Sequence, residues 1–282
     1  MKNNMTRILL IITLMIVSAC QHQTIQEDGH YHAMEQYPIN KWSTYISYDI
    51  KDGKITNFKY DAINLQEGLS KTKAQYAQAG KYLMHAPQGE WYKQARAIEK
   101  YLIDNNGDLA KVSFKQDGTS DAISGATIHW QNLPELLKTA QANGPSLKGS
   151  LIDGIYYKKM IKADEEGFTS TFGYFVDNGT IIGAHADAYG LFKNVPQEDG
   201  TKKDTILFKS DASKMNPSLF DLGNIALANY AQQANEVDNY FIKNNNFNKI
   251  TIDEKGNPDT IVGATINISD WLLLAKEAQK IN

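Results

Sequence analysis

The sequence predicts an α+β fold made of two similar domains in tandem, each a small antiparallel sheet with packed helices. Two observations predict it. The 282-residue chain repeats one order of segments, and each copy starts with two alternating segments joined by an Asp-Gly or Asn-Gly turn. Alternation is typical of half-buried strands, and these turns supply the positive φ that a two-residue hairpin needs. The hairpins lie at residues 48–62 and 174–188, an offset of 126 residues.

Both hairpins are followed by the same three elements: a helix that ends at an Asn-rich stretch, a short alternating strand, and a final amphipathic helix. The first copy is predicted to have them at residues 91–103, 109–114 and 133–142. The second copy is predicted to have them at residues 222–243, 248–252 and 271–280. The offset grows along the chain, so the second copy carries insertions, one of them near residues 191–196.

The composition excludes several classes of protein. Apolar residues make up 42% of the chain, which is enough for packed cores. The formal net charge is −3, with no basic excess, so we exclude nucleic acid as a partner. The single cysteine excludes a disulfide framework and any cysteine-based zinc or iron–sulfur cluster.

That cysteine ends an N-terminal apolar run. The basic residues Lys2 and Arg7 precede this run, which covers residues 8–19. A membrane span needs roughly 20 apolar residues, so the run is too short to cross a bilayer, and its length and charge order are typical of a secretory signal. Residues 17–20 resemble a bacterial lipobox, which implies acylation of Cys20 and a lipid anchor on the extracytoplasmic face of the cell membrane. The alternative is an ordinary signal peptide that leaves Cys20 as a free thiol.

The chain therefore divides into five predicted parts. Polar residues without periodicity follow the signal and are typical of a tether, and a segment with Gly, Pro and Ser separates the copies. The parts are a signal peptide at 1–19, a tether at 20–36, a first domain at 37–143, a linker at 144–150 and a second domain at 151–282.

The tether contains His22, His30 and His32. A His-x-His pair could bind a metal ion. Histidines on a flexible tether are more often solvated, however, and we predict no metal site.

One short motif occurs in both copies, just before the final helix. Glycine lets the backbone turn and approach another molecule closely, and a Thr near a helix N-terminus is a good cap. The same place favours an anion, so the Thr hydroxyl could instead carry a phosphate ester, and the residues alone leave both alternatives open. The first motif contains Asp121, Ser124, Gly125, Ala126 and Thr127, and the second contains Asp259, Gly263, Ala264 and Thr265.

The two motifs resemble the flavinylation sequence of the FMN-binding domain family, and the lipobox, tether and paired domains resemble the extracellular electron-transfer flavin lipoproteins of Gram-positive bacteria. The resemblance implies two FMN-binding-type domains in which an ApbE-type flavin transferase joins FMN, through its phosphate, to Thr127 and Thr265. It also implies that Asp121 and Asp259 serve recognition by the transferase or binding of its metal. The second motif departs from the pattern, because Val262 stands where Ser124 stands in the first.

The resemblance implies a membrane-anchored electron carrier with up to two covalent FMN groups. A quinone-linked dehydrogenase or flavoprotein in the membrane would supply the electrons, and an external acceptor would receive them. No nucleophile–base triad is apparent, so we expect a carrier rather than a stand-alone enzyme. The alternatives are a surface lipoprotein that binds a ligand without flavin, and a flavin-linked terminal reductase.

Side chains near the motifs receive simpler interpretations. Trp130 and Trp271 could stack on a flavin ring, but a Trp at the start of an amphipathic helix is more often part of the core. The pairs Lys71/Lys73 and Lys202/Lys203 are expected to be solvated rather than to approach a phosphate.

Overall fold

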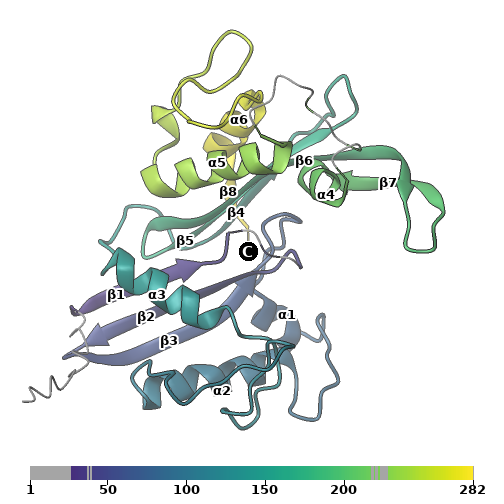
Figure 1. The fold of residues 1–282 in the computed structure, drawn as a ribbon. Helices are drawn as coiled ribbons and strands as arrows, with labels where there is room; N and C mark the ends of the chain where they lie inside the picture. The colour runs from purple at the N-terminus through teal and green to yellow at the C-terminus, as the bar shows by residue number, and fades with distance from the viewer. Residues whose placement is uncertain are drawn as a thin grey trace, which may run out of the picture.

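The computed structural model describes residues 27–281, apart from positions 37, 39, 217, 218, 220, 221 and 223–227. It confirms the α+β fold, with an antiparallel sheet in each copy of the repeat (Figure 1). The first copy contains strands β1 (Gly29–Met34), β2 (Ser43–Lys51) and β3 (Lys54–Ile63), and helices α1 (Lys73–Gln78), α2 (Trp91–Asp104) and α3 (Leu133–Asn143). The second contains strands β4 (Gly154–Lys159), β5 (Thr169–Asp177), β6 (Thr180–Pro196), β7 (Lys202–Phe208) and β8 (Gln279–Lys280), with helices α4 (Lys209–Met215), α5 (Tyr230–Asn244) and α6 (Ser269–Glu277) and the 3₁₀ helix η2 (Phe247–Lys249).

The two predicted hairpins are confirmed. Asp52 and Gly53 join β2 to β3 with φ values of 52° and 70°, and Asn178 and Gly179 join β5 to β6 with φ values of 50° and 73°. Two consecutive residues with positive φ make the turn that matches the twist of the flanking strands. Each hairpin also has a register irregularity just before its turn, at Asp49/Ile50 and at Phe175/Val176.

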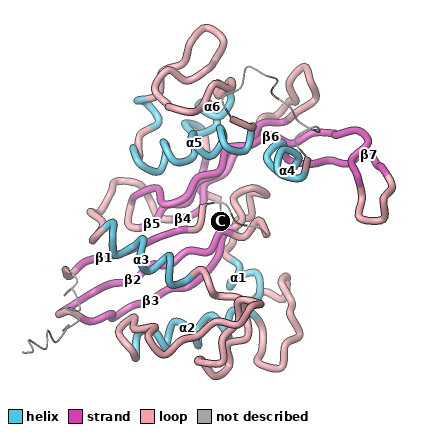
Figure 2. The backbone as a smooth tube through the Cα atoms, in the orientation of Figure 1, coloured by secondary structure: helices cyan, strands magenta, loops and turns pink. Residues whose placement is uncertain are grey.

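The molecule has four layers in the order helices, sheet, sheet, helices, which Figures 1 and 2 show from one side. The strand order is β1-β2-β3 in the first sheet and β7-β6-β5-β4-β8 in the second. The outer face of each sheet packs against its own helices, as with Ile46 and Tyr48 of β2 against α2 and α3. The inner faces meet in an apolar group that we call the inter-sheet cluster, formed by Met34, Tyr45, Ile63, Leu65, Ile155, Phe175 and Ile182.

The segment predicted as a linker is packed against both copies. Ser146 N–H donates to the His30 carbonyl over 2.7 Å, and Gly149 N–H donates to the Asn178 carbonyl over 2.9 Å. Gly149 lies so close to the second hairpin turn that a Cβ atom there would sit 2.0 Å from the Gly179 carbonyl oxygen. This contact explains why a glycine is needed at position 149.

The prediction of a tether at residues 20–36 is wrong for residues 29–34. Residues 29–34 form β1, which pairs with β2 in register from Gly29↔Ile50 to Met34↔Tyr45. Tyr31 and Ala33 are buried in the first core, which is why this polar-looking segment is a strand. The signal peptide, Cys20 and His22 lie outside the described residues. Within the described ranges, no helix has both the length and the apolar content needed to cross a bilayer.

The predicted strands at 109–114 and 248–252 are also wrong. Neither belongs to a sheet: the first is turn and loop, and the second overlaps η2 and makes one isolated bridge, from Ile252 to Pro258. The apolar residues of the first segment, among them Val112 and Phe114, pack against the core from a loop. Their alternation therefore reflects contact with the helices rather than pairing with a strand.

The later helices and the insertion agree better with the sequence. Helices α2, α3 and α6 occupy the predicted segments to within a few residues, while α5 begins at Tyr230, later than predicted. The insertion near residues 191–196 extends β6 to 17 residues, against 10 in β3, and adds β7. Phe192 of this insertion packs its ring on that of Phe168, with centroids 5.3 Å apart.

Candidate functional site

The two motif threonines lie in the loops before α3 and α6, and both are exposed. The residues at the N-cap positions of these helices are Asn132 and Ile268, so neither threonine caps a helix. The capping alternative left open by the sequence is therefore excluded. A different contact holds Thr127 and Thr265, and it is the same in both copies.

A buried glutamine holds each threonine. The Gln94 Oε1 atom accepts hydrogen bonds from Thr127 N–H over 2.7 Å and from the Thr127 hydroxyl over 3.2 Å. In the second copy, Gln233 Oε1 accepts from Thr265 N–H over 2.6 Å and from its hydroxyl over 3.1 Å. Both glutamine side chains belong to residues that are 0% exposed. The hydroxyl oxygen of each threonine is thus oriented by the core while the residue itself is exposed to solvent.

Each glutamine is oriented in turn by the start of its own helix. Gln94 Nε2 donates to the Gly89 carbonyl and Gln233 Nε2 to the Ala228 carbonyl, both over 2.9 Å. The amide therefore presents its oxygen, rather than its nitrogen, to the threonine.

The motif glycines turn the backbone into the left-handed region. Gly125 has φ of 84° and Gly263 has φ of 90°, where a side chain would cause strain. A Cβ atom on Gly125 would meet no heavy atom within 4 Å, so the space beside it is open. Ala126 and Ala264, which follow these glycines, are buried and fix the loop to the core.

The remaining motif positions lie at the surface. The Asp121 side chain is 81% exposed and accepts a hydrogen bond from Lys115 Nζ over 2.6 Å, and Asp259 is exposed as well. Val262 is 93% exposed, and its counterpart Ser124 is also exposed. These side chains can be reached by another protein and do not point into a core.

Thr127 lines a cavity of about 570 Å³ in the first copy. Aromatic residues form much of its wall, and its charged residues are Lys73 and Glu35, with His129 at the edge. Flat aromatic walls are typical of sites for planar ligands. The aromatic lining residues are Trp42, Tyr60, Tyr82 and Trp91.

Lys73 is the buried cation of this first cavity. Its Nζ atom lies 4.7 Å from the ring centre of Tyr82, 5.2 Å from that of Trp91 and 5.7 Å from that of Trp42. Burial lowers the pKa of Lys73 to about 8, against the opposing attraction of Asp61. The expectation that Lys73 is solvated is therefore wrong, although Lys71 of the same pair is exposed.

Thr265 lines the corresponding cavity of the second copy, of about 1040 Å³. Lys209, Tyr230 and Trp271 line it too, and Lys209 Nζ lies 5.8 Å from the ring centre of Tyr230. Burial lowers the pKa of Lys209. This cavity differs in carrying four acidic residues, which are Asp164, Glu165, Glu166 and Asp270.

One buried carboxylate in each copy positions the lysine. Asp61 Oδ1 accepts from the N–H groups of Ala62 and Ala74, which ties the start of α1 to the sheet beside Lys73. Asp187 Oδ1 accepts in the same way from the N–H groups of Ala188 and Ser210, which ties down α4 beside Lys209. Lys73 and Lys209 therefore occupy equivalent places in the two copies.

The expectation that Trp130 and Trp271 belong to the core is confirmed. Trp130 is 0% exposed and packs edge-on against Phe114, with ring centres 4.8 Å apart. Trp271 is 3% exposed and donates from Nε1 to the Asp187 carbonyl over 3.0 Å, although it also borders the second cavity.

Sequence reasoning missed both glutamines and Lys209. A signal was available, because Trp91-x-x-Gln94 at the start of one helix matches Tyr230-x-x-Gln233 at the start of the other, and Lys73-Ala74 matches Lys209-Ser210. Aligning the copies through these helices would have found the glutamines and the lysines together.

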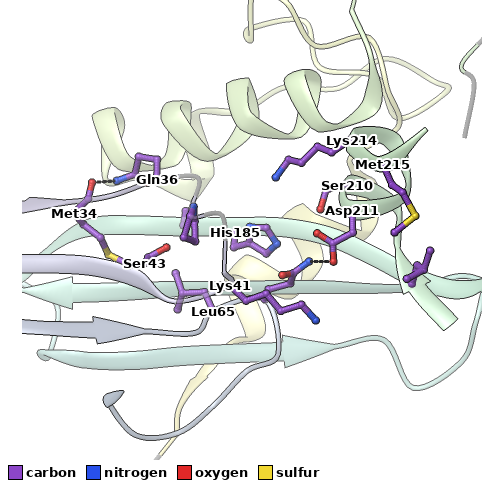
Figure 3. A pocket seen from close by; sticks show the side chains of 14 residues that line it. Met34, Gln36, Lys41, Ser43, Leu65, His185, Ser210, Asp211, Lys214 and Met215 are labelled. Carbon is purple, nitrogen blue, oxygen red and sulfur yellow. Dashed lines mark hydrogen bonds between the residues drawn. The ribbon is translucent and has the colours of Figure 1, made fainter. Parts of the chain in front are cut away.

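A third cavity, of about 670 Å³, lies between the copies and contains no motif residue (Figure 3). Met34 and Leu65 line it from the first copy, and His185, Asp211 and Lys214 from the second. Gln66 Nε2 donates to Asp211 Oδ2 over 3.0 Å across it.

Comparisons with known proteins assign no family. No family model matches the chain, and no curated protein matches it. A solution NMR structure of a Clostridium thermocellum protein, determined by a structural genomics consortium, is 31% identical over 42% of this chain and 92% of that chain. Its TM-score is 0.32, and the likeness supports no inference about function.

Proposed function

We propose that the chain is an extracytoplasmic, lipid-anchored electron-transfer flavoprotein that carries FMN in phosphoester linkage on Thr127 and Thr265. One observation carries the proposal. In each copy, a buried glutamine holds the hydroxyl of an exposed threonine, which lines a cavity together with aromatic residues and a lysine. The motif alone could mark a structural turn, but neither threonine caps a helix, and the same hydroxyl geometry recurs in both copies.

The residues present fit a covalently bound flavin. Thr127 is exposed and lines the cavity, so its hydroxyl can form the ester bond to FMN phosphate, losing its proton while the FAD used by the transferase releases AMP. Lys73 and the indole rings of Trp42 and Trp91 then offer positive charge and flat apolar surface beside it. In the second copy Lys209 and Tyr230 offer the same combination.

FMN, when bound, supplies one-electron and two-electron redox chemistry. The protein's own contribution is to position the flavin and to set its electrostatic environment. The lysine favours negative charge in the cavity, and the aromatic residues cover one side of a planar ligand. A membrane donor, an external acceptor and an ApbE-type transferase complete the proposed function, and the exposed Asp121 and Asp259 are available for contact with the transferase.

The intact mass of the full chain, co-expressed with an ApbE-type transferase, tests the proposal. We expect two FMN increments in the wild type, one in Thr127→Val or Thr265→Val, and none in the double variant. Thr139→Val is the matched control, because Thr139 is an exposed threonine on α3 outside the motif, and it should keep both increments. Absence of any flavin increment in the wild type, or increments that persist in the double variant, would contradict the proposal.

A further inference from the structure

The histidines of β1 lie on the face of the first sheet that meets the second. Side chains alternate along a strand, and Tyr31 and Ala33 point into the first core. His30 and His32 therefore share the opposite face with Met34, which belongs to the inter-sheet cluster. The histidines are not solvated on a tether: their side chains are only 23% and 15% exposed.

Both imidazoles converge on one carboxylate of the second copy. His30 Nε2 lies 2.7 Å from Asp177 Oδ2, and His32 Nδ1 lies 3.1 Å from the same oxygen. The Asp177 side chain is 17% exposed. Among the residues that the structure describes, this is the one group of three His, Cys, Asp or Glu whose ligand atoms lie within 4.8 Å of one another.

A second carboxylate orients the first histidine. Asp49 Oδ1 lies 2.7 Å from His30 Nδ1, and Asn57 Nδ2 donates to the other oxygen of Asp49 over 3.2 Å. A carboxylate on the far nitrogen is the usual partner of a metal-bound histidine, because it fixes the ring and makes the other nitrogen a better donor. Here it leaves His30 Nε2 directed at Asp177.

We propose that His30, His32 and Asp177 bind one Zn²⁺ ion, which joins the two sheets. Two imidazoles and a carboxylate are a donor set that zinc prefers, with water as the fourth ligand. Zinc–ligand bonds of about 2.0–2.2 Å in a tetrahedron separate the ligand atoms by roughly 3.3 Å. His30 Nε2 and His32 Nδ1, at 2.7 and 3.1 Å from Asp177 Oδ2, therefore need to move away from that oxygen by about 0.6 and about 0.2 Å. The ion takes the place of the proton shared between His30 Nε2 and Asp177 Oδ2, and that proton is released.

The site belongs to the junction of the copies and not to the repeated unit. Gly29 pairs with Ile50 as Gly154 pairs with Val176, so Ile155 and Tyr157 occupy in β4 the places of His30 and His32 in β1. The ligands come from β1 and from the hairpin end of β5, which are far apart in sequence. Bound zinc therefore stabilises the contact between the sheets, independently of any flavin.

Zinc titration of the full chain, after removal of metal with EDTA, tests the site. We expect one Zn²⁺ per chain with a dissociation constant in the micromolar range or tighter, and an increase of several degrees in the unfolding temperature at saturating zinc. His32→Gln and Asp177→Asn should each weaken binding at least tenfold and abolish the thermal shift, and Asp49→Asn should weaken it about 10–100-fold. Co²⁺ in place of zinc should give the visible absorption of a four-coordinate site.

Two control variants separate this site from other histidines. His129→Gln and His22→Gln should bind zinc as the wild type does, because His129 lies by the first cavity and His22 lies outside β1. The Thr127→Val/Thr265→Val variant should also bind zinc normally, so the outcome does not depend on the proposed flavin. Unfolding without metal shows whether each variant is folded. Absence of a thermal shift in the wild type, or a shift that survives in both His32→Gln and Asp177→Asn, would overturn the proposal.

Discussion

The cavities of the two copies share a frame and differ in charge. Each has a threonine on a buried glutamine and a lysine beside aromatic rings, but the first has Glu35 as its acidic lining residue, whereas the second has four acidic residues. The threonine and its glutamine recur in both copies although the charges around them differ, which indicates that the pair has the same role in each copy. The surroundings then set how each copy performs it.

A second difference lies under the middle of each sheet. Glu99 of α2 accepts from Tyr60 N–H over 2.9 Å and forms an ion pair with Arg96. Asp238 of α5 accepts from Ala186 N–H over 2.8 Å, but Asn235 stands where Arg96 stands in the first copy. The same backbone contact is thus supported by an ion pair with an arginine of the same helix in the first copy, and by the attraction of His185 and Lys214 in the second.

The largest effect is expected from removing the glutamines. Gln94→Leu and Gln233→Leu each leave a backbone N–H and a carbonyl without their buried partner, at a cost of about 2–4 kcal/mol in the free energy of unfolding. Urea denaturation measures it, and the mass of co-expressed protein should show loss of the FMN at the matching threonine only. Gln141→Leu, on the exposed side of α3, is the control and should change stability by about 0.5 kcal/mol or less. If only one of the two core variants is destabilised, the frames are not equivalent.

The two carboxylates should differ in the size of their effect, because burial raises the pKa of both but Arg96 opposes the shift at Glu99. Burial raises the pKa of Asp238 to about 7, so between about pH 4 and pH 7 the folded state holds a proton that the unfolded state releases, and stability falls as pH rises. Asp238→Asn should therefore flatten this dependence and stabilise the protein at pH 8 by up to about 4 kcal/mol. Glu99→Gln removes a carboxylate whose pKa burial also raises, but it gives up the pair with Arg96, so it should stabilise the protein at pH 8 less than Asp238→Asn does. Unfolding free energies of both variants from pH 4 to pH 8 measure this difference, and an equal or larger gain at pH 8 in Glu99→Gln would refute the contrast.

The charged residues that line the two cavities should give the proposed flavins different midpoint potentials. Thr127→Val keeps only the flavin on Thr265, and Thr265→Val keeps only the flavin on Thr127. We expect the flavin on Thr265 to have the lower midpoint potential, because four acidic residues line its cavity. Lys73→Met should lower the potential of the flavin on Thr127 and narrow the gap, since each kcal/mol lost by the reduced form corresponds to roughly 20 mV for a two-electron couple. Spectroscopic redox titration measures this, and identical potentials in the two single-flavin variants would remove the contrast.

The smallest effect concerns the one motif position that differs. Val262→Ser and Ser124→Val exchange exposed side chains, so the free energy of unfolding should change by about 0.5 kcal/mol or less. Val262→Ser should increase the fraction of chains with FMN on Thr265 during brief co-expression, if the hydroxyl contributes to recognition by the transferase. Mass spectra at early time points measure that fraction. An unchanged rate in both variants would show that this position does not matter to attachment.

The parts of the fold that depend on local chemistry could be predicted from the sequence. Asp52-Gly53 and Asn178-Gly179 specify their hairpin turns through residues that tolerate positive φ, and the amphipathic pattern of 91–103 specifies α2. The β1 strand could not be predicted, because polar His30 and His32 occupy the face that meets the second sheet. Only Tyr31 and Ala33 are left to show an apolar alternation, which is too short to indicate a strand.

The candidate site could be predicted only in part. The motif marks the threonines, because its residues are consecutive. The contacts of Thr127 with Gln94 and of Lys73 with Trp42 join residues about 30 positions apart, and nothing local specifies them. Asp177 meets His30 only because the two sheets pack face to face, so that pairing required the tertiary structure.

The inter-sheet cluster has a consequence for the relation between Thr127 and Thr265. Tyr45 and Phe175 pack with ring centres 4.8 Å apart, and the segment 144–150 is hydrogen-bonded to both copies, so the two copies contact each other directly and are not joined by a free linker. The distance between groups carried by the two threonines is then built into the molecule. Electron exchange between two flavins on these threonines would then have a rate independent of solvent viscosity. Exchange between freely diffusing domains would instead slow as the viscosity of the solvent rises.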